Sequence, residues 1–145
     1  MFVGLGQTVE DLGDISGIPV IPKTSFSMVT KELERVIDLS SGVDAIILCG
    51  IETHVCIQRT ALDLLQLGIE VHCVADAVSS RSLVDRMFAL ERMRQSGVFI
   101  TTSESVILGF MDGSEHPLFR DVQKLIIPKA PDSCLLSPRA EERRS

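Results

Sequence analysis

Residues 43–75 decide the fold, and they read VDAIILCGIETHVCIQRTALDLLQLGIEVHCVA. The apolar run from Val43 to Cys49 is typical of a strand that is buried on both faces. From Thr60 to Leu67 the apolar residues recur at helical spacing, and Gly68 then supplies a common helix-ending residue. Residues 69–75 are again apolar and β-branched, which favours a strand. This segment therefore predicts a strand–helix–strand unit.

The same alternation continues toward the C-terminus. Hydroxyl side chains at 79–82 can cap a helix that ends at Gly97. Residues 98–102 predict a third strand, and residues 103–111 predict a further helix. Strands that alternate with helices across short turns form parallel sheets with right-handed crossovers. The predicted fold class is therefore α/β, a three-layer domain around a parallel sheet.

The flanking segments are less regular. The N-terminal segment is mainly loop, with one short edge strand expected at Val20 and Ile21. A helix capped by Thr30 is expected over residues 30–37, and a last amphipathic helix over residues 119–127. We therefore expect one domain over residues 1–138, followed by a charged and mobile tail at 139–145.

The composition disfavours several classes of protein. A length of 145 residues suits one domain, and 45% hydrophobic with 23% charged residues is a globular composition. Fourteen Lys and Arg against twenty Asp and Glu leave a net charge of -6, which disfavours nucleic acid as a partner. No apolar run approaches the ~18 residues of a membrane span, and the N-terminus lacks the basic start of a secretory signal. We therefore expect a cytoplasmic protein without a membrane partner.

One of the four cysteines stands out by its position. Cysteines at 49, 56, 73 and 134 are too few and too irregularly spaced for a disulfide framework. Ligands of open parallel sheets bind at the carboxyl ends of the strands, which directs attention to residues 50–56. Free N–H groups at the start of the following helix would stabilise a thiolate at Cys56 and could hold an oxyanion. Cys56 is therefore a candidate nucleophile, the alternative being that it begins the buried face of the helix.

The histidines do not predict a metal site. His54 lies two residues before Cys56, so on a helix the two side chains would point to different sides. Metal binding would also need His72 and His116, whose positions have no recognised ligand spacing. The glycines near the N-terminus lack the pattern of a dinucleotide loop. We expect neither a metal nor a cofactor, and we expect Asp76 to cap a turn.

Three blocks of sequence occur in order: KTSFSM at 23–28, GIETHVC at 50–56 and VADAVSSR at 74–81. Together they resemble the isochorismatase-like cysteine hydrolases. The resemblance is close to the animal isochorismatase domain-containing members, since it includes DRMFAL at 85–90 and APDS at 130–133. It covers nearly the whole chain up to about Pro138, and the order and spacing of the blocks make it specific.

The resemblance implies a fold and a chemistry. The fold is a doubly wound α/β/α domain with a six-stranded parallel sheet in the order 3-2-1-4-5-6. The chemistry is hydrolysis of an amide or related bond by an Asp-Lys-Cys triad, without a cofactor. Matched by motif, Cys56 is the nucleophile and Lys23 its electrostatic partner. The backbone N–H groups of Glu52 and Cys56 form the oxyanion hole, which a cis peptide bond between Ile51 and Glu52 shapes.

One part of the family pattern has no match in this chain. The resemblance places the triad aspartate on the family's first strand, whereas this chain begins in the loop after the second strand. The first two strands and the helix between them are therefore expected to be missing. Asp11 and Asp14 lie in a glycine-rich loop, and Glu52 belongs to the oxyanion turn, so none of them replaces that aspartate.

Three functions stay open on the sequence. The first is a cysteine hydrolase of a small amide-like substrate with an incomplete triad. The second is a non-catalytic isoform that acts through association, as a homo-oligomer or with a full-length copy. The third is a redox-responsive protein in which Cys56 is oxidised instead of attacking a substrate.

Overall fold

The computed structural model describes residues 8–39, 42–128 and 133. Cys134, residues 130–132 and the expected tail at 139–145 lie outside these residues. The described elements, in chain order, are η1 (Glu10–Leu12), α1 (Lys31–Glu34), β1 (Ala45–Ile51), η2 (Thr53–Ile57), α2 (Gln58–Gln66), β2 (Glu70–Ser79), α3 (Leu83–Gln95), β3 (Phe99–Thr101), α4 (Ser103–Gly109) and α5 (Phe119–Ile126).

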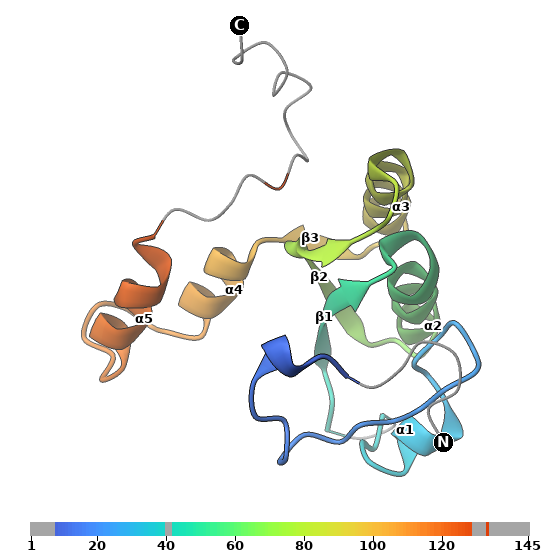
Figure 1. Cartoon of the computed structure of the whole chain (residues 1–145), viewed down its shortest axis with the longest axis horizontal. Coiled ribbons are helices and arrows are strands. Elements are labelled where there is room, and N and C mark those ends of the chain that lie inside the picture. Colours follow the sequence, from blue (N-terminus) through green and yellow to red (C-terminus); the bar gives the residue numbers. More distant parts are fainter. Residues whose placement is uncertain (1–7, 40–41, 129–132, 134–145) are drawn as a thin grey trace, which may run out of the picture.

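The three strands form one parallel sheet in the order β1-β2-β3. Ala45 pairs with Glu70 where β1 and β2 begin, and Cys73 on β2 pairs with Ile100 on β3. In Figure 1, α2 and α3 lie on one side of this sheet, while α4 and α5 extend away from it on the other. Helices therefore connect parallel strands, and the predicted α/β class is confirmed.

The edge strand expected at Val20 and Ile21 is wrong. These residues form no strand, and Val20 is 47% exposed. A strand needs a neighbour to accept and donate its ladder hydrogen bonds, and among residues 8–39 and 42–128 the sheet holds only β1, β2 and β3. Apolar β-branched residues alone are therefore not sufficient to form a strand here.

The helix expected over residues 30–37 begins where predicted and ends earlier. Thr30 is the N-cap, and its hydroxyl oxygen accepts the N–H of Leu33 at 3.3 Å. The helix ends at Glu34, and the N–H of Val36 then bonds the carbonyl of Leu33 at 2.9 Å. This tighter i→i+3 bond closes the last turn, so α1 contains a single helical turn.

β2 is longer than predicted because it leaves its pairing with β1 and returns to it. Leu48 pairs with Cys73, whereas Gly50, two residues later, pairs with Val78. Asp76 lies in the intervening part of β2, and its carboxylate accepts the Ser103 N–H at 2.8 Å and the Ser103 hydroxyl at 2.6 Å. Desolvation raises the pKa of Asp76. The hydrogen bonds from Ser103 lower it by more than that, so the pKa lies below its usual value. Asp76 therefore lies within β2 and binds the first residue of α4, 27 residues away in sequence, whereas the sequence predicted that it caps the turn after its own strand.

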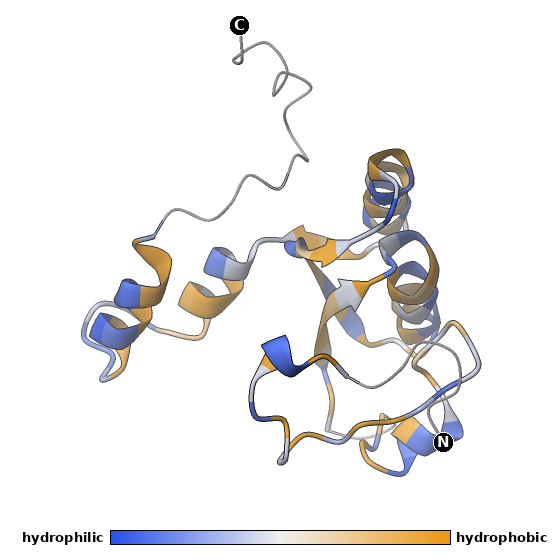
Figure 2. Cartoon of the chain, in the orientation of Figure 1, coloured by the Kyte–Doolittle hydropathy of each residue, from blue (hydrophilic) through white to orange (hydrophobic). Residues whose placement is uncertain are grey.

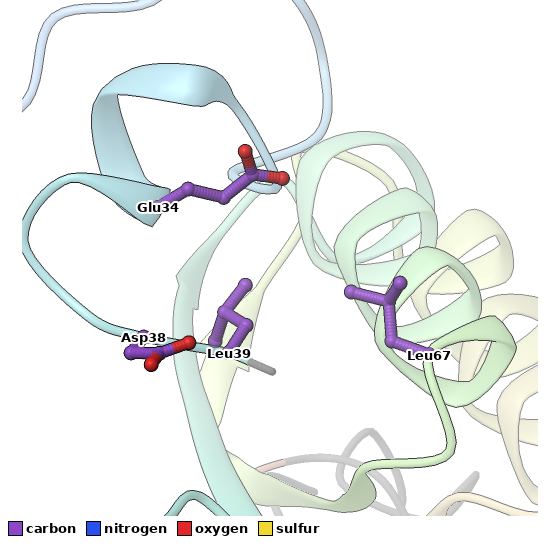
Figure 3. Close-up of a pocket in the computed structure, with 4 residues that line it drawn as sticks. All are labelled: Glu34, Asp38, Leu39 and Leu67. Atoms are coloured by element: carbon purple, nitrogen blue, oxygen red, sulfur yellow. The ribbon is translucent and has the colours of Figure 1, made fainter. Parts of the chain in front are cut away.

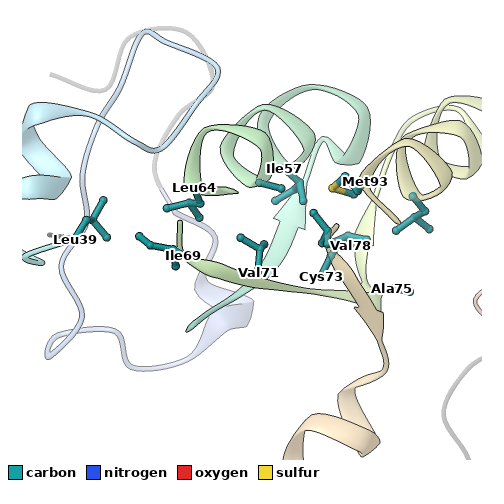
Figure 4. Close-up of a cluster of buried hydrophobic side chains, with 12 residues drawn as sticks. Leu39, Ile57, Leu64, Ile69, Val71, Cys73, Ala75, Val78 and Met93 are labelled. Atoms are coloured by element: carbon teal, nitrogen blue, oxygen red, sulfur yellow. The ribbon is translucent and has the colours of Figure 1, made fainter. Parts of the chain in front are cut away.

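The core lies between the sheet and its two covering helices (Figure 4). Ala61 and Leu64 face it from α2, Val71 and Cys73 from β2, and Met93 from α3; each is at most 1% exposed. Burial raises the pKa of the Cys73 thiol to about 11. Cys73 therefore serves as a packing residue.

Arg86 is a buried charged residue that joins three parts of the chain. It belongs to α3 and is 6% exposed. Its guanidinium group donates to the carbonyl of Ala75 on β2 at 2.6 Å and to the carbonyl of Ser133 at 2.8 Å. Arg86, which lies in the block at 85–90, therefore contacts Ala75 of the block at 74–81 and Ser133 of the block at 130–133.

Apolar surface is exposed on β1 and on the helices that extend from the sheet. On β1, Ile47 is 42% exposed, although the run from Val43 to Cys49 predicts a strand buried on both faces, and Ile51, beyond that run, is 70% exposed. Helix α5 buries no residue, and Leu125 on it is 73% exposed (Figure 2). Within the described part of the chain, none of the helices has both the length and the apolar character needed to cross a membrane.

We predict that Gly50→Ala destabilises the protein. Gly50 has a φ of +118°, a conformation that L side chains rarely adopt, while an added Cβ would meet only Ile57 at an ordinary 3.9 Å. The cost is therefore conformational, about 1–3 kcal/mol of unfolding free energy, measurable by urea denaturation. Gly109→Ala is the control, because Gly109 is helical and has no atom within 4 Å of an added Cβ. Equal stability of the two variants would contradict the prediction.

Candidate active site

The turn after β1 contains a π-helical segment. The peptide bond between Ile51 and Glu52 is cis, as the resemblance implied, and η2 follows as a π-helix. The Glu52 carbonyl accepts the N–H groups of Val55 at 3.2 Å and of Ile57 at 3.1 Å. The second of these is an i→i+5 bond, and Cys56 is one of the four residues between its donor and its acceptor. Such π turns are rare and occur frequently at functional sites, and no feature of the sequence predicted this one.

Lys23 and Cys56, 33 residues apart in sequence, meet at this turn. The Lys23 Nζ atom lies 3.6 Å from the Cys56 Sγ atom. The same ammonium group donates to the carbonyls of Ser25 and Phe26, both at 2.8 Å. Three hydrogen bonds therefore hold the ammonium group of Lys23 in place, and one of them brings its positive charge beside the Cys56 sulfur.

Thr60 connects the loop that carries Lys23 to the helix that follows Cys56. It is 3% exposed, and its hydroxyl group donates to the carbonyl of Cys56 at 2.6 Å. The same oxygen accepts the N–H of Met28 at 2.9 Å. Sequence analysis missed this residue; the available signal was a hydroxyl side chain at the start of the apolar face of α2. Thr60 therefore fixes the position of Lys23 relative to Cys56.

The carboxylate of Glu52 faces the end of β2. Its Oε2 atom accepts the backbone N–H of Arg81 at 3.1 Å and lies 3.6 Å from the Nδ1 atom of His54. That same Nδ1 atom is 3.0 Å from the Ser80 hydroxyl. A Ser-His-acid relay uses the two different nitrogens of the imidazole ring, so this arrangement is not one. His54 and Glu52 instead link the turn after β1 to the turn after β2.

The structure places the two expected oxyanion donors, Glu52 and Cys56, in one turn. Glu52 is the N-cap of η2, and Cys56 lies within η2. Both follow the carboxyl end of β1, where open parallel sheets bind ligands. Among the residues that the structure describes, no group of three His, Cys, Asp or Glu side chains is arranged to hold a metal ion.

A pocket of about 580 Å³ lies elsewhere (Figure 3). Glu34, Asp38, Leu39 and Leu67 line it, so it is located at the far end of α2 from Cys56. The nine residues of α2 span about 14 Å at 1.5 Å per residue. The pocket is therefore separate from the Lys23–Cys56 pair.

These features define a class of protein: a parallel α/β domain with a lysine–cysteine pair at the carboxyl end of a strand. A family model described as the isochorismatase domain matches residues 5–105. The chain belongs to this isochorismatase domain family.

Two curated relatives and one solved structure show how much of the family domain is present. The chain is 55% identical to zebrafish (Danio rerio) isochorismatase domain-containing protein 1, over 92% of this chain and 47% of that protein. It is 56% identical to isochorismatase domain-containing protein 2 of Xenopus laevis, over 92% of this chain and 65% of that protein. A structure titled MAR1 ribonuclease from Caenorhabditis elegans matches with 51% identity and a TM-score of 0.73, over 79% of this chain and 58% of that chain. The chain therefore spans about half to two thirds of the length of these relatives.

We predict that limiting iodoacetamide alkylates Cys56 first at neutral pH. Cys56 combines partial exposure with an ammonium group at 3.6 Å, whereas Cys49 is exposed and Cys73 is buried. Mass spectrometry of tryptic peptides, covering Cys134 as well, measures the four rates. Lys23→Met is expected to lower the alkylation rate of Cys56 roughly tenfold, because the sulfur loses an opposite charge in contact with it. The alkylation rate of Cys49 is expected to stay unchanged. Equal labelling of all four cysteines would exclude the assignment of Cys56 as the nucleophile.

Proposed function

We propose that this chain carries the nucleophile of a cysteine hydrolase that cleaves a small amide-like substrate. The observation that carries the proposal is the 3.6 Å contact between Lys23 Nζ and Cys56 Sγ at the turn after β1. Membership of the isochorismatase domain family supports it, as does the position of the turn at the carboxyl edge of a parallel sheet. A reduced thiol is required, so a reducing compartment such as the cytoplasm is part of the proposal.

The reaction divides into two steps. In the first, the Cys56 thiolate attacks the carbonyl carbon, and the carbonyl oxygen becomes an oxyanion that the N–H groups of Glu52 and Cys56 would bind. The carbon–nitrogen bond then breaks, the nitrogen leaves with the proton that a base had taken from the Cys56 thiol, and a thioester remains. In the second step, water gives up a proton and attacks the thioester, which releases a carboxylic acid and the thiolate. The net reaction is amide plus water to acid plus amine, without a cofactor.

The second step needs a base to take the proton from water. The described side-chain hydrogen bonds of Lys23 and Cys56 lead to backbone carbonyls and to each other. The Glu52 carboxylate binds Arg81, so it does not serve as this base. We propose that an aspartate in the part of the relatives without a counterpart here, on a strand next to β1, supplies it.

RNA is the second substrate to consider, because the C. elegans structure is titled a ribonuclease. Phosphodiester recognition relies on lysine and arginine, and this chain carries 14 of these against 20 Asp and Glu. The ammonium of Lys23 is already committed to two carbonyls and a sulfur. A neutral carboxamide is therefore the proposed substrate, in preference to RNA. RNA cleavage that Cys56→Ala abolishes would reverse this choice.

Association with another chain is the second candidate function, and the open edge of β1 favours it. β1 pairs with β2 on one side, and Ile47 and Ile51 leave apolar surface exposed. Unpaired strand edges without charged residues readily take up another strand. The partner would be a second copy of this chain or a full-length copy. Oxidation of Cys56 stays the third candidate and would show as a reversible sulfenic acid after mild peroxide treatment.

We predict that the hydrolysis of small carboxamides depends on Cys56 and Lys23. Release of ammonia or amine from a panel of such amides is the measurement. Cys56→Ala is expected to lower the rate by roughly 10³-fold or more, because the covalent route is lost. Lys23→Met is expected to lower it by roughly 100-fold, and Cys49→Ala serves as the control without an effect. Full activity in Cys56→Ala would refute the hydrolase proposal. A native chain that neither turns over nor becomes acylated at Cys56 would favour association.

We predict that the chain alone pairs with itself or aggregates through β1. Size-exclusion chromatography with thermal melting provides the test. Ile47→Lys places a charge on the exposed surface of β1 and is expected to increase the monomer fraction. Val84→Lys adds the same charge on α3, away from β1, and is the matched control. A monodisperse monomer with a cooperative transition at or above ~45–65 °C would contradict the prediction.

A further inference from the structure

We propose that the Glu52 carboxylate is a positioning residue that holds the oxyanion turn against the end of β2. The inference rests on the proposed function, since it assigns a role within the same site. Its basis is one hydrogen bond, in which the Arg81 N–H donates to Glu52 Oε2 at 3.1 Å across 29 residues of sequence. The oxyanion donors lie on the backbone of the same turn.

The sheet itself does not hold this turn firmly. β1 and β2 lose register between Leu48 and Gly50, and β2 makes its excursion to α4 there. The strands meet again only at two pairs, Gly50 with Val78 and Ile51 with Ser79. Glu52 is the first residue beyond these pairs, and its side chain adds a further link to β2. The bond to Arg81 therefore continues the strand pairing to the point where the turn begins.

Glu52 makes two contacts, one through its backbone carbonyl and one through its side chain. Its carbonyl accepts the Val55 and Ile57 N–H groups and so defines the π turn around Cys56. Its carboxylate is anchored to Arg81. A shift of Glu52 would thus move its own N–H group and the backbone of Cys56 together. We call the hydrogen bond between Glu52 and Arg81 the tether. Since oxyanion donors act only within a narrow distance range, the tether controls how well the turn stabilises negative charge.

His54 makes a parallel contact that serves as an internal control. Its Nδ1 atom contacts the Ser80 hydroxyl at 3.0 Å and lies 3.6 Å from Glu52 Oε2. The charged or titratable groups at this junction are Glu52, His54 and Arg81, and the contact between Lys23 and Cys56 belongs to the same turn. Ser80→Ala removes the histidine contact and keeps the Arg81 N–H, so the two links can be tested separately.

The test is the pH profile of Cys56 alkylation by iodoacetamide, with Cys49 as an internal reference and thermal melting in parallel. Glu52→Ala removes the acceptor, and Arg81→Pro removes the donor N–H. Both variants are expected to lower the alkylation rate of Cys56 at neutral pH by about fivefold or more. Both are also expected to move the midpoint of the pH profile to higher pH. The double variant should be no slower than either single variant, because both changes break one bond.

Two variants serve as matched comparisons. Glu52→Gln keeps an oxygen that accepts the Arg81 N–H and is expected to restore most of the Cys56 rate. Arg81→Ala keeps the backbone N–H and is expected to match the native chain, as is Ser80→Ala. A merely structural role would lower the melting temperature and leave the profile unchanged.

The outcomes separate this inference from the proposed function. An unchanged profile in Glu52→Ala and Arg81→Pro, with Cys56 still faster than Cys49, would overturn the tether alone. Equal loss in Glu52→Gln and Glu52→Ala would also overturn it, since charge rather than the bond would then matter. A native Cys56 no faster than Cys49 would overturn the proposed function and the tether with it. If Glu52→Ala does not fold, the comparison of Arg81→Pro with Arg81→Ala decides the question.

Discussion

The Lys23 ammonium group reaches the Cys56 sulfur from a loop that the hydroxyl of Thr60 joins, at Met28, to the backbone of Cys56. The loop that carries Lys23 has no strand or helix of its own between residues 18 and 30. It is held by the Met28 N–H bond to Thr60, whose hydroxyl also binds the carbonyl of Cys56. A loop fixed in this way can present a charge at a defined distance, whereas a free lysine side chain would remain in water. The chemistry of the site thus depends on one buried hydroxyl group at the start of α2.

The site is well formed although the sheet around it is open. Helices α2 and α3 bury one side of the sheet, while β1 keeps apolar residues exposed along its length. The chain spans 58% of the C. elegans structure, so a family domain contains substantially more than the elements described here. In the proposed hydrolysis, the base and the cover for the exposed surface of β1 would come from the same neighbouring region. A strand placed beside β1 would cover the first and supply the second.

The hydrophobic pattern predicted the order of strands and helices because β2, α2 and α3 bury apolar residues in one core. The apolar run of β1 predicted a strand, although its residues are not buried in this structure. Position along the chain indicated Cys56, since the turn after a central parallel strand is where ligands bind. Lys23 could be assigned only through the resemblance, because a lysine in a loop carries no periodic signal. The strand at Val20 and Ile21 was wrong, since it depends on a neighbour that local sequence cannot specify. The π turn, the excursion of β2 and the role of Thr60 all arise from tertiary contacts and therefore could not be predicted.

The most direct test of the account is to identify the atom that takes up an acyl group. The chain is mixed with an activated acyl donor such as a p-nitrophenyl ester, quenched in acid to preserve thioesters, and digested for mass spectrometry. The account predicts one acyl group per chain, attached to the sulfur of Cys56 and removed by hydroxylamine, with the adduct absent in Cys56→Ala. An acyl group on Lys23 or distributed among the other cysteines, or none at all, would contradict it.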